Sequence, residues 1–215
     1  MNTSQPTPLR KDAERNRARI LEAARAVFAA HGVHASLEAV AERAGVGIAT
    51  LYRRFPTRAD LVGALYDEEY TEYGTALDEA LAFDDAWRGL EHYFERVCQH
   101  QASHAGLPDA LTTTLPGNRH LEAGRARLRE QMSQLIARAQ QQGTLRADVT
   151  PEDLAFVLIG TGAVVAATSP VAPNAWRRHL ALTLDGFRAE GARTLPVPPL
   201  SQRQLFRAML RRGLP

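Results

Sequence analysis

The stretch that decides the fold runs over residues 41–56 and reads AERAGVGIATLYRRFP. Apolar residues at helical spacing follow Ser36, which is a good N-cap, and they predict a helix that ends at about Ala44. Two glycines then interrupt the pattern for three residues, and it resumes over residues 48–55 until a proline ends it. Two short helices joined by a tight glycine turn are typical of a helix-turn-helix.

The second of these helices is too short to bury much surface alone, so its apolar side must lean on neighbouring helices. We expect Leu51 and Phe55 to be buried there. The opposite side, which we expect to be exposed, carries Ile48, Ala49, Tyr52 and Arg53. A helix-turn-helix that binds DNA places this exposed side in a major groove.

The flanking sequence adds basic chemistry. A helix is predicted from Arg15 to His31, and Thr57 with Asp60 forms a capping box that starts a further helix at Arg58. Residues 1–60 contain ten basic and six acidic side chains, although the whole chain carries a net charge of only +2. Nearly all basic residues are arginine, whose planar fork suits phosphate. This distribution is consistent with a nucleic-acid partner for the N-terminal region, although charge alone favours a solvated, arginine-rich surface.

The remainder of the chain shows helical patterns and no convincing strand alternation, so the predicted fold class is all-α. We expect a flexible basic arm over 1–14, a helix-turn-helix DNA-binding domain over 15–60, a helical effector-binding and dimerisation domain over 61–194, and a Pro-rich connector with a short helix over 195–215. The further helices are predicted near 83–104, 119–142, 150–169, 174–192 and 201–212.

Composition excludes several other classes of protein. Cys98 is the single cysteine among 215 residues, so no internal disulfide is possible, and the first residues lack a signal-peptide pattern. We therefore expect a cytoplasmic protein. Residues 154–176 are uncharged, but small and polar residues and two prolines interrupt the run, which favours a buried helix over a membrane span. No cofactor or membrane partner is predicted.

Over residues 41–61 the sequence resembles the TetR family of helix-turn-helix transcriptional regulators. The resemblance implies a homodimer that binds a near-palindromic double-stranded DNA operator and carries a small effector in a C-terminal domain. By matched position, Ile48, Ala49 and Arg53 are expected to face bases. The residues expected near phosphates or at the helix ends on the DNA are Ser36, Gly47, Thr50, Tyr52, Arg54 and Arg58. Gly47 stands where many relatives have serine, and Ala49 replaces a common glycine, so base preference cannot be copied.

The helix near residues 83–104 offers a candidate effector surface. Its aromatic and aliphatic stripe favours a mainly apolar effector with one or two polar groups. The residues predicted to line the cavity, between this helix and the one that starts at Arg58, are Trp87, Tyr93, Val97, His100 and His104. His100 and His104 have an i, i+4 metal spacing, but no carboxylate is in register with them, so no metal site is predicted.

The leading hypothesis is a one-component transcriptional repressor that a small-molecule effector releases from its operator. Two other functions compete with it. A helical ligand carrier or enzyme with a non-functional helix-turn-helix needs a catalytic pair, and Cys98 lies on an apolar stripe where a thiol is normally inert. No enzyme activity is therefore predicted. A nucleoid protein without sequence preference is disfavoured by the modest net charge. For assembly, we expect the helices near 151–169 and 176–187 to form a four-helix bundle across a two-fold axis.

Overall fold

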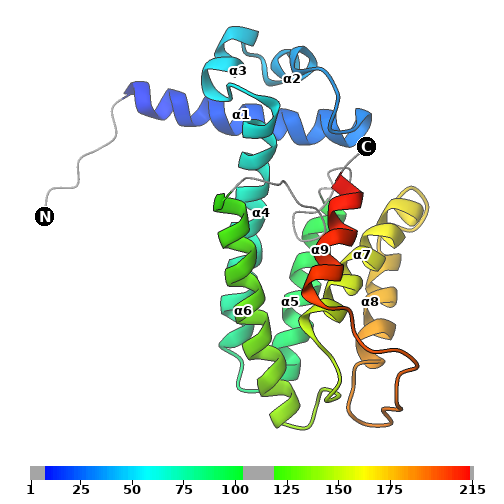
Figure 1. Cartoon of the computed structure of the whole chain (residues 1–215). Helices are drawn as coiled ribbons and strands as arrows, with labels where there is room; N and C mark the ends of the chain where they lie inside the picture. Colours follow the sequence, from blue (N-terminus) through cyan, green and yellow to red (C-terminus); the bar gives the residue numbers. More distant parts are fainter. Residues whose placement is uncertain (1–7, 104–118, 214–215) are drawn as a thin grey trace, which may run out of the picture. The chain divides into compact units, whose positions relative to one another are not determined.

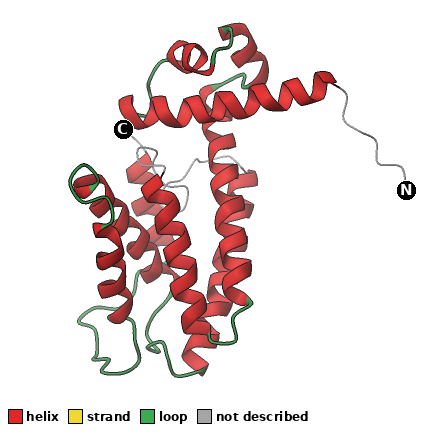
Figure 2. Ribbon diagram, turned by 180° about the vertical axis from the view of Figure 1, so that it is seen from behind, coloured by secondary structure: helices red, strands yellow, loops and turns green. Residues whose placement is uncertain are grey.

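The computed structural model describes residues 8–103 and 119–213 of the chain. These residues divide into two compact units, Met1–Leu65 and Tyr66–Pro215. Helices make up nearly all of the regular structure in the described ranges, and the one β-bridge there joins Leu145 to Arg188 (Figure 2). The predicted all-α fold class is confirmed. The helices are α1 (Pro8–His31), α2 (Leu37–Ala44), α3 (Ile48–Arg54), α4 (Arg58–Leu81), α5 (Ala86–Ser103), α6 (Arg119–Gln141), α7 (Pro151–Thr168), α8 (Ala175–Asp185) and α9 (Gln202–Gly213) (Figure 1).

In the first unit, the bounds of α2 and α3 follow from local capping. Ser36 Oγ accepts a hydrogen bond from Ala39 N at 3.2 Å, which caps α2 as predicted. Gly45 ends α2 at φ 62°, where its N–H donates to Glu42 and that of Val46 donates to Ala41. This pair of bonds is a Schellman motif, which favours glycine at the left-handed position. The turn then leads into α3 at Ile48.

The beginning of α4 is fixed by the predicted capping box. Asp60 Oδ2 accepts from the backbone N–H of Thr57 at 2.9 Å, and Thr57 Oγ1 accepts from Asp60 N at 3.1 Å. Both bonds satisfy donors that a helix N-terminus leaves without partners. Residues of α4 up to Leu65 belong to the first unit, and those from Tyr66 belong to the second.

The prediction placed the N-terminus of α1 at Arg15, and the helix in fact begins at Pro8. Residues 8–14 of the predicted flexible arm are therefore helical, and residues 1–7 lie outside the described residues. Proline is compatible with the first turn of a helix, because the N–H that it lacks has no partner there. An ion pair of 2.7 Å between Arg15 and Asp12, three residues apart, supports the added turns.

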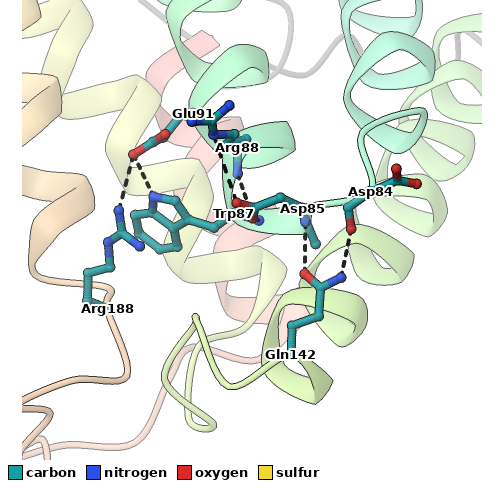
Figure 3. A network of polar contacts seen from close by, with 8 residues as sticks. Asp84, Asp85, Trp87, Arg88, Glu91, Gln142 and Arg188 are labelled. Carbon is teal, nitrogen blue, oxygen red and sulfur yellow. Dashed lines mark hydrogen bonds and ion pairs between the residues drawn. The ribbon is translucent and has the colours of Figure 1, made fainter.

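The second unit packs α5, α6, α7 and α8 together around a core that contains Phe94 and Leu135. The helix expected near Phe83 begins at Ala86, because Asp85 Oδ1 accepts hydrogen bonds from Trp87 N and Arg88 N and so caps α5. Gln142 at the end of α6 accepts from Ala86 N and donates to Asp84 O (Figure 3). The loop between α4 and α5 is thus fastened to α6.

The helix predicted over residues 174–192 ends at Asp185. The chain turns at Gly186, after which Arg146 N donates to Phe187 O and Ala189 N donates to Thr144 O, both at 3.1 Å. Pairing with the segment before α7 therefore replaces the last helical turns, and periodicity alone does not reveal this tertiary contact. The predicted starts of α6 and α7 are confirmed, including the capping box of Thr150 with Asp153.

Among the described helices, α7 is the one long and apolar enough to cross a membrane by length and composition, a test that core helices of soluble proteins also pass. Its buried residues include Leu154, Val157 and Thr161. Its other side is apolar and open to solvent in the isolated chain, with Phe156 44% exposed. A Cβ built on Gly162 meets no atom within 4 Å. Over residues 8–103 and 119–213, this face of α7 has no packing partner.

Candidate functional site

Helix α3 presents the face that the sequence predicts. Leu51 and Phe55 are buried, with 0% and 4% of their surfaces exposed. The opposite side is exposed over the four predicted positions, and two of these carry large apolar or aromatic groups, Ile48 at 36% and Tyr52 at 44% exposed. The exposed set also includes Ala49 and Arg53. An apolar tip flanked by arginine is suited to contact base edges and phosphates in a groove.

The three arginines of this region differ in their surroundings. Arg53 and Arg54 are exposed, and neither forms a hydrogen bond or ion pair with another residue that the structure describes. Arg58 is half-buried, and its Nη1 donates to Val33 O at 2.8 Å and to Ala35 O at 2.6 Å. The prediction assigned Arg58 to phosphate alone. The structure gives it a second task, which is to hold the connection between α1 and α2.

Two further contacts fix Arg58 in place. Its Cζ lies 5.9 Å from the centroid of the Phe28 ring, within the range of a cation–π interaction. Its charge also contributes to lowering the pKa of Glu38, although hydrogen bonds from the Glu38 backbone and from Ser36 lower that pKa more. Sequence spacing does not reveal the hydrogen bonds of Arg58, because their acceptors are the backbone carbonyls of Val33 and Ala35, which are more than twenty residues away.

The remaining predicted DNA-contact residues lie at the helix ends. Ser36 is exposed, but its hydroxyl already caps α2 and donates to Glu38 Oε2 at 2.9 Å. Gly47 is the N-cap of α3 and provides no side-chain bond, while a Cβ at this position would meet no atom within 4 Å. Thr50 is half-buried on the same helix. Their roles at DNA remain predictions.

The second unit contains a cavity of about 610 Å³, a size typical of sites for small molecules. Helices α5, α6, α7 and α9 line it. The predicted helix contributes Tyr93 and Phe94, both buried. No residue of α4 is among its lining, so this cavity does not lie at the position predicted for the effector, between α4 and α5. Where the effector binds remains a prediction.

Of the predicted effector residues that the structure describes, Tyr93 alone lines this cavity. Val97 is 1% exposed and packs in the core, and His100 is half-buried with its ring edge-on to that of Tyr73 at 5.6 Å. His104 lies outside the described residues. The amphipathic pattern identified the buried stripe correctly but could not tell core packing from cavity lining.

Trp87 is part of a polar network at the other side of α5 (Figure 3). Its Nε1 donates to Glu91 Oε1 at 2.5 Å, and Cζ of Arg188 lies 3.9 Å from the ring centroid. Arg188 Nη2 also approaches Glu91 at 3.5 Å. These residues line a second, smaller pocket of about 430 Å³ between α5 and α8. Trp87 therefore joins the C-terminal end of α8 to α5.

The histidines on α5 do not converge. His92 Nε2 lies 2.8 Å from Glu79 Oε2, and this contact, with a weaker effect of Arg96, lowers the pKa of Glu79. Arg96 also pairs with Glu72. Over the described ranges, no group of three or more His, Cys, Asp or Glu side chains could hold a metal ion.

Most of the cavity's apolar lining comes from α6, α7 and α9, and the sequence patterns do not reveal it. The signal for α9 was present, since Leu205 and Met209 are four residues apart in a predicted helix and so share a face. The side chains that line the cavity without having been predicted include Leu128, Met132, Leu154, Leu158, Arg203, Phe206, Arg207 and Met209.

Two family models match the chain, and together they cover both units. Residues 20–65 match the model of bacterial regulatory proteins of the tetR family, and residues 85–189 match the C-terminal domain of SbtR-like transcriptional regulators. An HTH-type transcriptional regulator of Staphylococcus aureus, SAUSA300_2515, is 44% identical over 54 residues. That match covers 25% of this chain and 29% of the curated relative.

Solved structures extend the likeness to most of the chain. The TetR transcriptional regulator SCO0520 from Streptomyces coelicolor is 31% identical with a TM-score of 0.54, and the match covers 80% of this chain and 98% of that one. The ketosteroid transcriptional regulator KstR2 of Mycobacterium tuberculosis, 19% identical with a TM-score of 0.58 over 80% of this chain and 94% of its own, supports the fold alone. These families and relatives are transcriptional regulators and not enzymes, and the chain belongs to the TetR family of transcriptional regulators.

Proposed function

We propose that this protein is a one-component repressor that binds a near-palindromic operator as a homodimer in the cytoplasm and is released by a small molecule. The observation that carries the proposal is the exposed face of α3 in a chain of this family. Ile48 and Tyr52 are exposed together on one side of α3, beside Arg53, for which the described residues supply no hydrogen-bond or ion-pair partner. In a major groove, the same side chains find base edges and phosphates.

In this proposal the residues of the first unit divide into two groups. Ile48, Ala49 and Arg53 face bases, and Tyr52 and Arg54 bind phosphates, with Ser36, Gly47 and Thr50 at the periphery. Arg58 keeps the α1–α2 connection in place through Val33 and Ala35 and reaches phosphate only with the donors that this task leaves. Phosphate contacts set the register on the duplex, and base contacts set the preferred sequence.

Dimerisation is proposed through α7 and α8. Besides Phe156, large apolar residues are exposed at Val171, between the two helices, and at Leu182 on α8, with 85% and 62% of their surfaces accessible. Open space at Gly162 would let a second chain approach closely. Large apolar residues exposed on neighbouring helices favour a subunit interface. A two-fold dimer would present two copies of α3 to two half-sites.

The cavity of the second unit is the proposed effector site. Leu128 lines it from α6, and its Cδ2 lies 3.9 Å from the position of a Cβ at Gly74 on α4. Tyr70 of α4 packs similarly against Gly124. A ligand that moves α6 would therefore act on α4, which contributes to both units. Such coupling typically changes operator affinity by about 5- to 150-fold, and operator DNA must weaken ligand binding equally.

Selection of bound sequences from random DNA tests the proposal. The protein should enrich an inverted repeat whose half-site centres are about 34 to 36 Å apart, or a multiple of that spacing. The double variant Tyr52→Ala/Arg53→Ala should enrich nothing, whereas Arg88→Ala, which removes an exposed arginine from α5, should enrich the same repeat as the wild type. Enrichment of a single non-repeated site, or of no site by the wild type, would contradict the proposal.

A further inference from the structure

The cavity of the second unit has an apolar floor. Its buried apolar residues on α5, α6 and α7 are Tyr93, Phe94, Leu128, Met132, Leu154 and Leu158, and Met209 of α9 lies beside them. The buried charged residue of the lining is Glu152, which has a partner. A surface of this kind gains free energy by covering an apolar ligand and provides little to solvate a charge. The body of the ligand is therefore apolar.

The rim of the same cavity is charged, and the charges are unequal. Arg129 is paired with Glu152 at 2.7 Å, and the Glu152 side chain is only 6% exposed, so these two charges balance each other. Among the other ionisable side chains of the lining, Arg203 and Arg207 of α9 accompany a single carboxylate, that of Glu122. Two exposed cationic groups beside one carboxylate favour an anion at the mouth of the cavity.

Two of these arginines are placed for a ligand. Arg203 and Arg207 are four residues apart on α9, so they lie on one face of the helix and at the cavity. Both are exposed, and no hydrogen bond or ion pair joins either of them to another side chain that the structure describes. Guanidinium groups bind carboxylates and related oxyanions through parallel hydrogen bonds.

Helix α9 is an addition to the part of the chain that the family models match. The match to the C-terminal domain ends at residue 189, and α9 begins at Gln202 after a proline-containing connector. Ser201 and Gln204 cap its N-terminus, since Gln204 Oε1 accepts from Ser201 N at 2.9 Å and from Ser201 Oγ at 2.8 Å. The helix that completes the cavity and makes its mouth cationic thus comes from outside the matched domain.

We propose that the cavity binds an amphipathic anion, with its apolar body on the floor formed by α5, α6 and α7 and its anionic group held at the mouth by Arg203 and Arg207. The inference rests on the proposed function, because it names the chemical class of the effector. It also separates this chain from relatives whose domain ends before α9, since their cavities would lack these two cations.

Isothermal titration of the full chain without DNA tests the proposal with three probes of one chain length: decanoate, decan-1-ol and decyltrimethylammonium. Decanoate should bind about tenfold or more tightly than the cation of the same length, since a favourable contact of about 1.4 kcal/mol corresponds to a factor of ten. Decan-1-ol should lie between them. Equal or tighter binding of decyltrimethylammonium would overturn the proposal, as would the absence of binding by all three probes.

Variants locate the site. Arg203→Gln/Arg207→Gln should weaken decanoate about tenfold and leave decan-1-ol unchanged, and both substitutions fall on exposed positions that the fold does not need. The matched control Arg88→Gln should leave both probes unchanged. Ala155→Phe, which adds a ring to the cavity wall, should weaken decanoate and decan-1-ol alike. Wild-type affinity for decanoate in either cavity variant would overturn the assignment.

The titrations distinguish this proposal from the proposed function. The ligand-free Arg203→Gln/Arg207→Gln protein should bind operator DNA like the wild type. If the charge preference is absent while operator binding persists, the ligand class is wrong and the repressor remains. If the wild type shows the charge preference but no sequence-specific DNA binding, the proposed ligand class is supported and the proposed repressor function is wrong.

Discussion

The two units of the molecule carry their functional side chains in different ways. In the first unit, the seven residues of α3 contain both the buried side and the exposed face, and the caps that bound it lie within a few residues. In the second unit, the cavity lining extends from Tyr93 to Met209 and draws on four helices. A recognition surface formed by one local segment can be predicted from sequence. A cavity formed by segments that are distant in sequence cannot, because it depends on how they pack.

The largest expected effect is on operator affinity, and it tests whether DNA binding by the first unit requires dimerisation by the second. Gly162→Arg places a charged side chain in the open space on α7 that a second chain is proposed to cover. Loss of simultaneous binding to two half-sites should weaken operator affinity by about 10²- to 10⁴-fold. Sedimentation should show monomers, and fluorescence anisotropy should show the weakened binding.

Ala123→Arg is the control for that prediction, because it adds the same charge to an exposed position of α6. It should leave both the dimer and the operator affinity unchanged. A dimeric Gly162→Arg protein with wild-type affinity would remove α7 from the interface, and a monomeric wild type at micromolar concentration would remove the dimer itself.

The next largest effect separates structure from DNA contact within the first unit. Arg58→Ala removes hydrogen bonds from a charged donor to Val33 and Ala35, and bonds of this kind contribute about 1.5 to 3 kcal/mol. The free energy of unfolding should fall accordingly in urea denaturation. Arg54→Ala, at an exposed position, should change stability by less than about 0.5 kcal/mol.

Salt dependence completes the comparison of these two arginines. Arg54→Ala should reduce the slope of log affinity against log salt by about one unit, because it removes one phosphate contact. An Arg58→Ala variant as stable as the wild type, with the same loss of slope, would return Arg58 to a purely phosphate-binding role.

Substitution of Arg53 should change binding free energy by a similar amount to the stability change at Arg58, but only at particular base positions of the operator. Arg53→Ala should cost about 1 to 3 kcal/mol at one base position of each half-site and relax the preference there. Tyr52→Phe should weaken all sequences alike, because it removes a phosphate contact. Affinities for a panel of single-base operator variants measure both effects. Equal loss on every operator for Arg53→Ala would remove it from the base-reading set.

The smallest effect concerns Gly47. Gly47→Ser supplies a side-chain cap at the N-terminus of α3, where the structure has space for it, and serine is better than glycine at this position by only a few tenths of a kcal/mol. Thermal unfolding should show a slightly more stable protein. A marked loss of stability would mean that the turn before α3 needs glycine for its backbone.

The sequence predicts well those features that depend on neighbouring residues. The cap at Ser36, the left-handed turn at Gly45 and the capping box of Thr57 with Asp60 are local, and so the bounds of α2, α3 and the start of α4 follow from them. The start of α1 at Pro8 differs from the prediction, because two prolines near the N-terminus indicate a loose arm, whereas a first helical turn tolerates proline.

Features that depend on distant partners could not be predicted. Helix α8 ends at Asp185 because residues 187–189 pair with residues 144–146. Helical periodicity in the sequence does not indicate that pairing. Arg58 looked like a free cation because its carbonyl acceptors are remote in sequence. Trp87 looked like a cavity aromatic, although Arg188 from beyond α8 covers its ring.

The most direct test of the central claim, sequence-specific DNA recognition by α3, is an anisotropy titration of the selected operator and a scrambled duplex at several salt concentrations. The operator should bind about 10³-fold or more tightly than the scrambled duplex, and Tyr52→Ala/Arg53→Ala should reduce it to the scrambled level. For both duplexes, log affinity should fall linearly with log salt. Equal affinity of the wild type for the two duplexes at every salt concentration would contradict the claim.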